Sequence, residues 1–367
     1  MNDVAELKQY VGVHARAQGI AGFEDVLTTI QGDDDGPHSW VAQWSRSAEK
    51  LERQGQLLEA CRHYIMARFP YVDGPARQRA LEQAVGTFDR WRRDESDIKR
   101  LNVDLPSGRL GCWTIDLDAG DHRPLLLIMG GIVSVKEQWA LLLARARELG
   151  MAGLVTEMPG AGENTLRYDA DSWHMVSDVL DAVRDAGGDP SRTYALALSF
   201  SGHMALRCAM EDRRIRGIVV AGAPVSAFYT DVGWQAALPR VTVDTLAHLA
   251  GEEPGDVLGR MRGWALTGHQ LGGLDIPVYA LVSLRDEIIP AADAEMLRGH
   301  LRRLHVRNND DVHGSPGHVA ESGLWFMLSL SQMGGGDQHQ RMTLQRRLAE
   351  LERQRQPAAR SMREEYQ

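Results

Sequence analysis

The sequence predicts an α/β protein whose mostly parallel central sheet is flanked by helices and preceded by a helical segment. Between residues 101 and 335, short apolar runs of strand length alternate with helical stretches. Residues 1–100 instead show helical periodicity and no β-branched runs. Alternating strands and helices build a parallel sheet that is covered on both faces.

The N-terminal segment, residues 1–100, is expected to fold as a helical domain of its own. Its apolar residues recur at helical spacings, and the positions between them are rich in Gln, Arg and Glu. The recurring apolar residues are Val41, Trp44, Leu51, Leu57, Leu58, Cys61, Leu81, Val85, Phe88 and Trp91. The acidic run at 33–36 predicts a loop between helices.

The central segment, residues 101–335, is expected to form the sheet. It begins with a β-hairpin over 101–117, because apolar and polar residues alternate around a Pro-Ser-Gly turn at 106–108. The further strands are predicted at 124–130, 152–160, 193–199, 217–224, 277–284 and 304–308. The helices between them are predicted at 136–149, 171–186, 202–212 and 291–304.

Two segments lie outside this alternation. Residues 226–275 are too long for one crossover and predict a helical insertion over the carboxyl edge of the sheet, where ligands bind in open α/β folds. Residues 336–367 form a tail in which 342–356 predict a charged helix. The thin apolar stripe of that helix allows docking on the body, docking on a second subunit in a homodimer, or exposure to solvent.

Composition and charge bound the function. A net charge of -9 argues against nucleic acid or an anionic membrane surface as the main partner, which leaves a small-molecule substrate. Cys61, Cys112 and Cys208 are isolated, so we expect no disulfide framework, no metal site and a reducing cytoplasm. No secretory signal or membrane-spanning run is predicted, and no motif calls for a cofactor.

The strongest chemical signal is the passage from the strand at 193–199 into a helix. Ser199 stands at the turn, as in the nucleophile elbow written G-x-S-x-G. The tight turn requires small residues two positions before and after the nucleophile, and here they are Ala197 and Ser201. Ser201 is the alternative nucleophile, but it would place His203 at a position that needs a small residue.

An acid and a histidine follow later strands. Asp286 comes after the strand at 277–284 and precedes Ile-Ile-Pro, and His313 stands in a His-Gly pair after the last strand. His318 is the alternative base, closer to the start of the next helix. Serine, acid and histidine, each directly after a strand, follow the chain order of α/β-hydrolases. The sequence therefore predicts this fold, with Ser199, Asp286 and His313 as catalytic triad.

A glycine pair after the strand at 124–130 predicts the oxyanion hole. Gly130 and Gly131 let the backbone approach a substrate closely. The N–H of Ile132 or of a neighbour can then pair with that of Phe200, which begins the helix after the nucleophile. A dinucleotide-binding fingerprint is the competing interpretation, but the third glycine is missing.

These motifs resemble a known family. G-x-x-S-x-K-E at 131–137, MPGAGE at 158–163 and the elbow are similar to the family of the fermentation-respiration switch protein. That family includes carbon–carbon bond hydrolases such as 2,6-dihydroxypseudooxynicotine hydrolase, and fungal enzymes that shorten polyketide chains. The resemblance covers roughly residues 45–330. It implies the same triad and oxyanion region, and a lid formed by the N-terminal helices.

The expected reaction is hydrolysis of an ester, or of an activated ketone such as a β-diketone, in a medium-sized, polyketide-like acyl compound. Tyr229, Asp231 and Trp234, which follow the predicted strand at 217–224, are candidates to line the pocket together with His318. One alternative is a lyase that eliminates an acyloxy group such as acetate, as a hydrolase-fold enzyme of polyketide tetronate pathways does. The other is a catalytically inactive fold that binds a small molecule or a protein.

Overall fold

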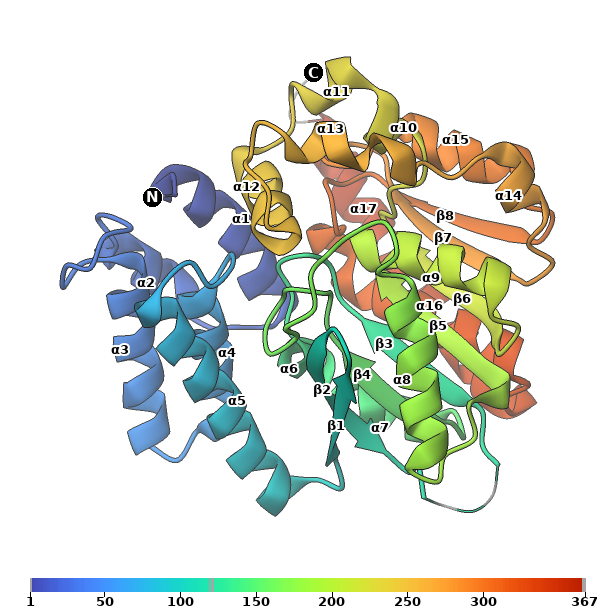
Figure 1. The fold of residues 1–367 in the computed structure, drawn as a ribbon, viewed down its shortest axis with the longest axis horizontal. Coiled ribbons are helices and arrows are strands. Elements are labelled where there is room, and N and C mark those ends of the chain that lie inside the picture. The colour runs from blue at the N-terminus through green and yellow to red at the C-terminus, as the bar shows by residue number, and fades with distance from the viewer. Residues whose placement is uncertain (1, 119, 121, 365–367) are drawn as a thin grey trace.

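A single sheet of eight strands forms the centre of the computed structural model, which describes residues 2–118, 120 and 122–364 (Figure 1). The strands are β1 Lys99–Leu105, β2 Gly108–Ile115, β3 Leu125–Met129, β4 Ala152–Thr156, β5 Thr193–Leu198, β6 Ile215–Ala221, β7 Val278–Ser283 and β8 Leu304–Asn309. Their spatial order is β1-β2-β4-β3-β5-β6-β7-β8, parallel from β4 onward, with β1 and β2 antiparallel at one edge. The mostly parallel sheet and the hairpin are confirmed.

Each face of the sheet has its own apolar core, because side chains alternate along a strand. On one face, Leu125, Leu127 and Met129 of β3 join a cluster with residues of α8 His174–Asp185 and α9 Phe200–Glu211. On the other face, Leu126 and Ile128 join α7 Leu142–Glu148 and α16 Val319–Gly334. All five residues of β3 are buried, which explains the uninterrupted apolar run in the sequence.

The N-terminal segment is helical, as the sequence predicts. Its helices are α1 Val4–Ala17, α2 Phe23–Thr29, α3 Trp40–Arg53, α4 Leu57–Arg68 and α5 Pro75–Glu95. Their buried residues belong to the same cluster as Leu126 and Ile128 of the sheet. Phe88 of α5 makes one of these contacts, with its ring centroid 5.0 Å from that of Trp113 on β2. The N-terminal helices therefore share a core with one face of the sheet.

The predicted insertion consists of short helices, one of which lies beside α1 of the N-terminal segment (Figure 1). They are α10 Ala227–Thr230, α11 Val232–Gln235, α12 Arg240–Ala250, α13 Val257–Met261 and α14 Gly268–Gly272. The carboxylate of Glu6 in α1 accepts hydrogen bonds from the backbone N–H groups of Arg240 and Val241, at 2.8 and 2.9 Å. The rings of Tyr71 and His248 stack 4.5 Å apart. The Glu6 hydrogen bonds hold α1 against α12, and the stacked rings hold the loop after α4 against α12.

Two helix predictions need correction or completion. The single helix expected at 136–149 is two helices, α6 Lys136–Trp139 and α7. The tail helix is longer than expected, α17 Gln338–Glu364. Its Leu348 is buried, and Glu352 forms a 2.7 Å ion pair with Arg307 of β8, so the tail docks on the body of the same chain. Among the described residues, no helix combines the length and apolar character needed to cross a bilayer.

Substitution Phe88→Ala tests the shared core. The side chain is fully buried, so its removal is expected to lower the free energy of unfolding by about 3–5 kcal/mol. Urea denaturation followed by tryptophan fluorescence and by far-UV circular dichroism should still give one coincident transition. The matched control is Phe326→Ala in α16, which is only partly buried and should cost less. Two separate transitions, with one unaffected by Phe88→Ala, would contradict a shared core.

Candidate active site

The turn between β5 and α9 holds Ser199 in a strained backbone conformation. Its φ is 58° and its ψ is -129°, a combination that L-residues rarely adopt and that costs about 1–3 kcal/mol. The Ser199 N–H donates to the carbonyl of Ala221 on β6 at 2.7 Å, and the Ser199 carbonyl accepts from Gly202 N–H at 2.9 Å. A Cβ on Gly202 would lie 2.6 Å from that of Ala223, so this helix needs glycine to approach β6.

The structure brings Ser199, His313 and Asp286 together. The Oγ of Ser199 lies 3.0 Å from Nε2 of His313, and Nδ1 of His313 lies 2.9 Å from Oδ2 of Asp286. The carboxylate of Asp286 is oriented by the backbone N–H groups of Ile288 and Ile289, which donate to Oδ1 at 2.9 and 2.8 Å. This is the hydrogen-bonding geometry of a nucleophile, a base and an orienting acid.

The competing residues make other contacts. The hydroxyl of Ser201 is buried and donates to the carbonyls of Met129 and Leu198, at 2.9 Å each. His318 pairs through Nδ1 with Asp311 at 3.1 Å, at the start of α16. The structure thus gives the contact with Ser199 to His313, and His318 belongs to a second, separate His–Asp pair.

Two neighbouring carboxylates raise the pKa of the His313 imidazole. Burial alone would lower the pKa of its imidazole, but the negative charges of Asp286 and Glu287 outweigh burial and raise that pKa above the usual 6.5. Glu287 also accepts a hydrogen bond from the backbone N–H of His313 at 3.0 Å. A positive imidazolium is therefore stabilised at this position, as a base that takes the serine proton requires.

Helix α1 brings two residues near the site that sequence reasoning missed. Burial and, to a smaller extent, the positive charges of Arg68 and His313 together lower the pKa of His14 to about 4. Burial and the carboxylates of Glu287, Glu6 and Asp286 raise the pKa of Tyr10. The two side chains are four residues apart and share a helix face, but that spacing is common in helices and carries no motif.

Gly131 lies directly against the nucleophile. A Cβ built on it would be 2.9 Å from Cβ of Ser199, so a side chain there would displace the serine. On Gly130 a Cβ would be 2.3 Å from Nε1 of Trp139. The next residue, Ile132, is buried, as is Phe200 at the start of α9. The predicted oxyanion-hole residues therefore flank Ser199 on both sides.

The predicted pocket residues of the insertion have structural partners. Tyr229 is fully buried, with its ring 5.0 Å from that of His203. Asp231 is exposed and caps α11 by accepting from the Trp234 N–H at 3.0 Å. Trp234 donates through Nε1 to the carbonyl of Ile288 at 2.9 Å, beside the loop that holds Asp286. In the described part of the chain, no group of three His, Cys, Asp or Glu side chains is arranged to hold a metal ion.

Comparison with known proteins places this geometry in a family. Residues 24–300 match the family described as Esterase FrsA-like. Esterase FrsA of Vibrio cholerae is 23% identical over 319 residues, which cover 80% of this chain and 76% of that protein. A solved structure named AbyA5 wild type is 51% identical with a TM-score of 0.92, covering 95% of this chain and 100% of that chain.

The solved structure of 2,6-dihydroxy-pseudo-oxynicotine hydrolase shares the fold at 16% identity. Its TM-score is 0.70, and the alignment covers 88% of this chain and 95% of that chain. The predicted family resemblance and α/β-hydrolase fold are confirmed, and the family is one of enzymes rather than of inactive binding folds. The chain therefore belongs to the FrsA-like esterase family and is a hydrolase with the α/β-hydrolase fold.

Proposed function

We propose that the protein is a serine hydrolase that cleaves an ester, or an activated carbon–carbon bond such as that of a β-diketone, in a medium-sized, polyketide-like acyl compound. The observation that carries the proposal is the 3.0 Å contact between the strained Ser199 hydroxyl and His313, which Asp286 orients. Family membership supports the ester, and the motif resemblance at 131–137 and 158–163 supports the carbon–carbon bond.

In the proposed reaction, Nε2 of His313 removes the Ser199 proton while Oγ attacks the substrate carbonyl. The oxyanion accepts hydrogen bonds from the backbone N–H groups of Phe200 and Ile132, at the helix N-terminus and the glycine turn. His313 then gives its proton to the leaving group, which departs as an alcohol from an ester or as a methyl ketone from a β-diketone. Water, deprotonated by His313, releases the acyl group from Ser199.

Substitution Ser199→Ala tests the nucleophile. It is expected to lower kcat/KM for p-nitrophenyl butyrate by at least about 10³-fold, because the hydroxyl forms the covalent bond. Ser201→Ala is the matched control. Its hydroxyl donates to backbone carbonyls and not to His313, so at least about a tenth of the activity should remain.

Circular dichroism verifies that both variants fold. If Ser201→Ala lost more activity than Ser199→Ala, Ser201 would be the nucleophile instead of Ser199. Undiminished turnover of an acyloxy substrate in Ser199→Ala would instead favour the lyase, in which His313 removes a neighbouring proton and the acyloxy group departs.

The pH profile tests the electrostatics of His313. Only the neutral imidazole accepts a proton, so kcat/KM should rise with pH through a midpoint above 6.5, the ordinary histidine pKa. Glu287→Gln removes a negative charge that raises this pKa, so the midpoint should move to lower pH. The amide oxygen of the new glutamine can still accept from the His313 N–H, which preserves the local geometry.

Arg285→Gln is the control for this experiment. Arg285 also lies on the loop after β7, but it is exposed and pairs with Asp310, so its loss should leave the midpoint in place. An unchanged midpoint in Glu287→Gln, or equal displacements in both variants, would contradict the assignment.

A further inference from the structure

We propose that the buried carboxylate of Glu157 is a positioning residue that fixes the oxyanion loop, which we define as residues 130–136. The proposal rests on the serine-hydrolase function above and assigns a role to charges that the triad does not use. The loop leaves β3 at Gly130, passes Ser199 at Gly131 and ends at Lys136, the first residue of α6.

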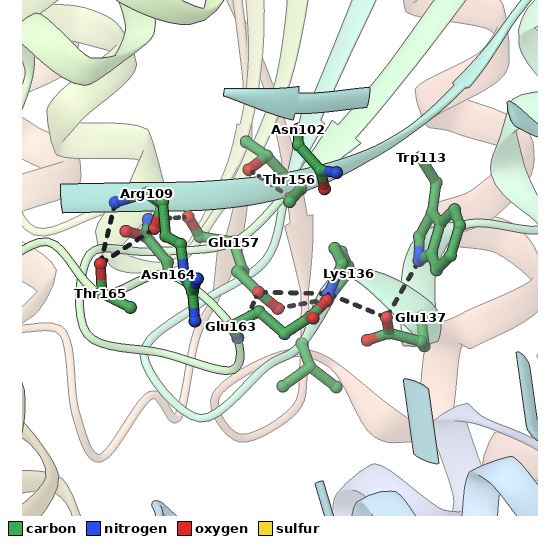
Figure 2. Close-up of polar contacts among 12 residues, drawn as sticks. Asn102, Arg109, Trp113, Lys136, Glu137, Thr156, Glu157, Glu163, Asn164 and Thr165 are labelled. Carbon is green, nitrogen blue, oxygen red and sulfur yellow. Dashed lines mark hydrogen bonds and ion pairs between the residues drawn. The ribbon is translucent and has the colours of Figure 1, made fainter. Parts of the chain in front are cut away.

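Lys136 lies at the centre of a buried ion cluster (Figure 2). Its side chain is fully buried, and Nζ lies 2.9 Å from Glu137, 3.3 Å from Glu157 and 2.6 Å from Glu163. Arg100 of β1 adds a second cation, 2.7 Å from Glu163. Buried charges persist only when they are paired and hydrogen-bonded, so the geometry of this cluster is strongly determined.

Glu157 differs from the other acids because it holds backbone as well as side chains. Its Oε2 accepts from the Lys136 N–H at 3.0 Å, and its Oε1 accepts from the Glu163 N–H at 2.7 Å. One carboxylate, directly after β4, therefore ties the end of the oxyanion loop to the loop at 158–163. A Cβ on Gly162 would lie 2.2 Å from Oε2 of Glu157, so glycine there leaves room for the carboxylate. This accounts for the K-E and MPGAGE motifs together.

The charges around Glu157 act in opposite directions on the pKa of its carboxylate. Burial raises the pKa of Glu157 to about 7, with Glu137 and Glu163 raising it and Lys136 opposing. Burial also acts to raise the pKa of Glu163, but Lys136 and Arg100 outweigh it and lower that pKa to about 2. Glu157 is thus less strongly held in its charged form than Glu163 is.

The other end of the loop is fixed by the sheet. Met129, at the end of β3, pairs with Thr156 of β4 and with Ala197 of β5, two residues before the nucleophile. Between the ends, Arg68 of α4 donates through Nη2 to the carbonyl of Val133 at 2.8 Å. Release of the Lys136 anchor would therefore displace the backbone N–H groups around Ile132 relative to Ser199. An oxyanion donor that moves away costs about 10²-fold in rate.

Glu157→Gln tests the anchor, with Glu137→Gln as matched control. Both substitutions replace a buried acid of the cluster with an amide of the same shape. An amide at 157 places its NH₂ against one of the two backbone N–H groups that the carboxylate now accepts from. Glu137 instead accepts from Nε1 of Trp113 at 3.0 Å through Oε1, so its amide can keep that contact.

The readouts are kcat and KM for p-nitrophenyl butyrate, and binding of 1,1,1-trifluoro-2-octanone compared with 2-octanone. The trifluoro ketone forms a tetrahedral oxyanion adduct and the plain ketone does not. Glu157→Gln should lower kcat by about 30–100-fold and weaken the binding of the trifluoro ketone by a similar factor. KM and the binding of 2-octanone should stay within about threefold of the wild-type values. Glu137→Gln should stay within about threefold in every readout.

Gly162→Ala is a second test of the proposal, for use if Glu157→Gln fails to fold. Its methyl group displaces the Glu157 carboxylate without altering any charge, and its control is Gly150→Ala, at a φ of +71° with no atom within 4 Å of the added Cβ. Gly162→Ala should reproduce the loss of kcat and Gly150→Ala should not.

The inference is overturned if folded Glu157→Gln keeps the wild-type kcat and the wild-type preference for the trifluoro ketone. It is also overturned if a variant and its matched control, such as Glu157→Gln and Glu137→Gln, lose equal fractions of kcat. A wild-type enzyme that neither hydrolyses the ester nor discriminates between the ketones would instead refute the proposed function.

Discussion

The backbone of Ser199 lies in a conformation that its own residue type disfavours, and the surrounding structure is built to maintain it. The turn is held by the hydrogen bond to Ala221, and Gly131 and Gly202 allow close approach on two sides of it. A strain of about 1–3 kcal/mol persists only where such packing over-determines the geometry. The result is a hydroxyl at the carboxyl edge of β5, where His313 reaches it.

Much of the surrounding machinery consists of hydrogen bonds between buried carboxylates and backbone N–H groups. The carboxylate of Asp286 is aligned by two N–H groups, and that of Glu157 spans two loops. Arg68 extends this support to α4, so the N-terminal helices are connected to the loop beside Ser199 through this hydrogen bond and through the shared core. In the proposed mechanism, oxyanion stabilisation depends on the placement of backbone N–H groups, so we expect the buried ion cluster outside the triad to influence the reaction rate.

The sequence predicts the fold well because the fold is indicated by patterns of residues that are close together in the chain. Strand-length apolar runs give the sheet, and the chain order of Ser199, Asp286 and His313 gives the expected triad. The sequence does not predict the break between α6 and α7, because residues 140–141 carry no Gly or Pro to mark it. The Lys136 cluster could not be predicted, since its members come from β1, α6 and the loop after β4 and meet only in the tertiary structure. Likewise, nothing local indicates that α1 brings His14 near His313.

The covalent step is the central claim, and rapid-quench mass spectrometry tests it most directly. The wild-type protein is mixed with excess p-nitrophenyl butyrate, quenched in acid within milliseconds, digested and mapped. We expect a transient butyryl group on the peptide that contains Ser199, formed in a burst that equals the enzyme concentration when deacylation is slower than acylation. A butyryl group on another residue, or turnover with no acylated peptide at any quench time, would contradict the account.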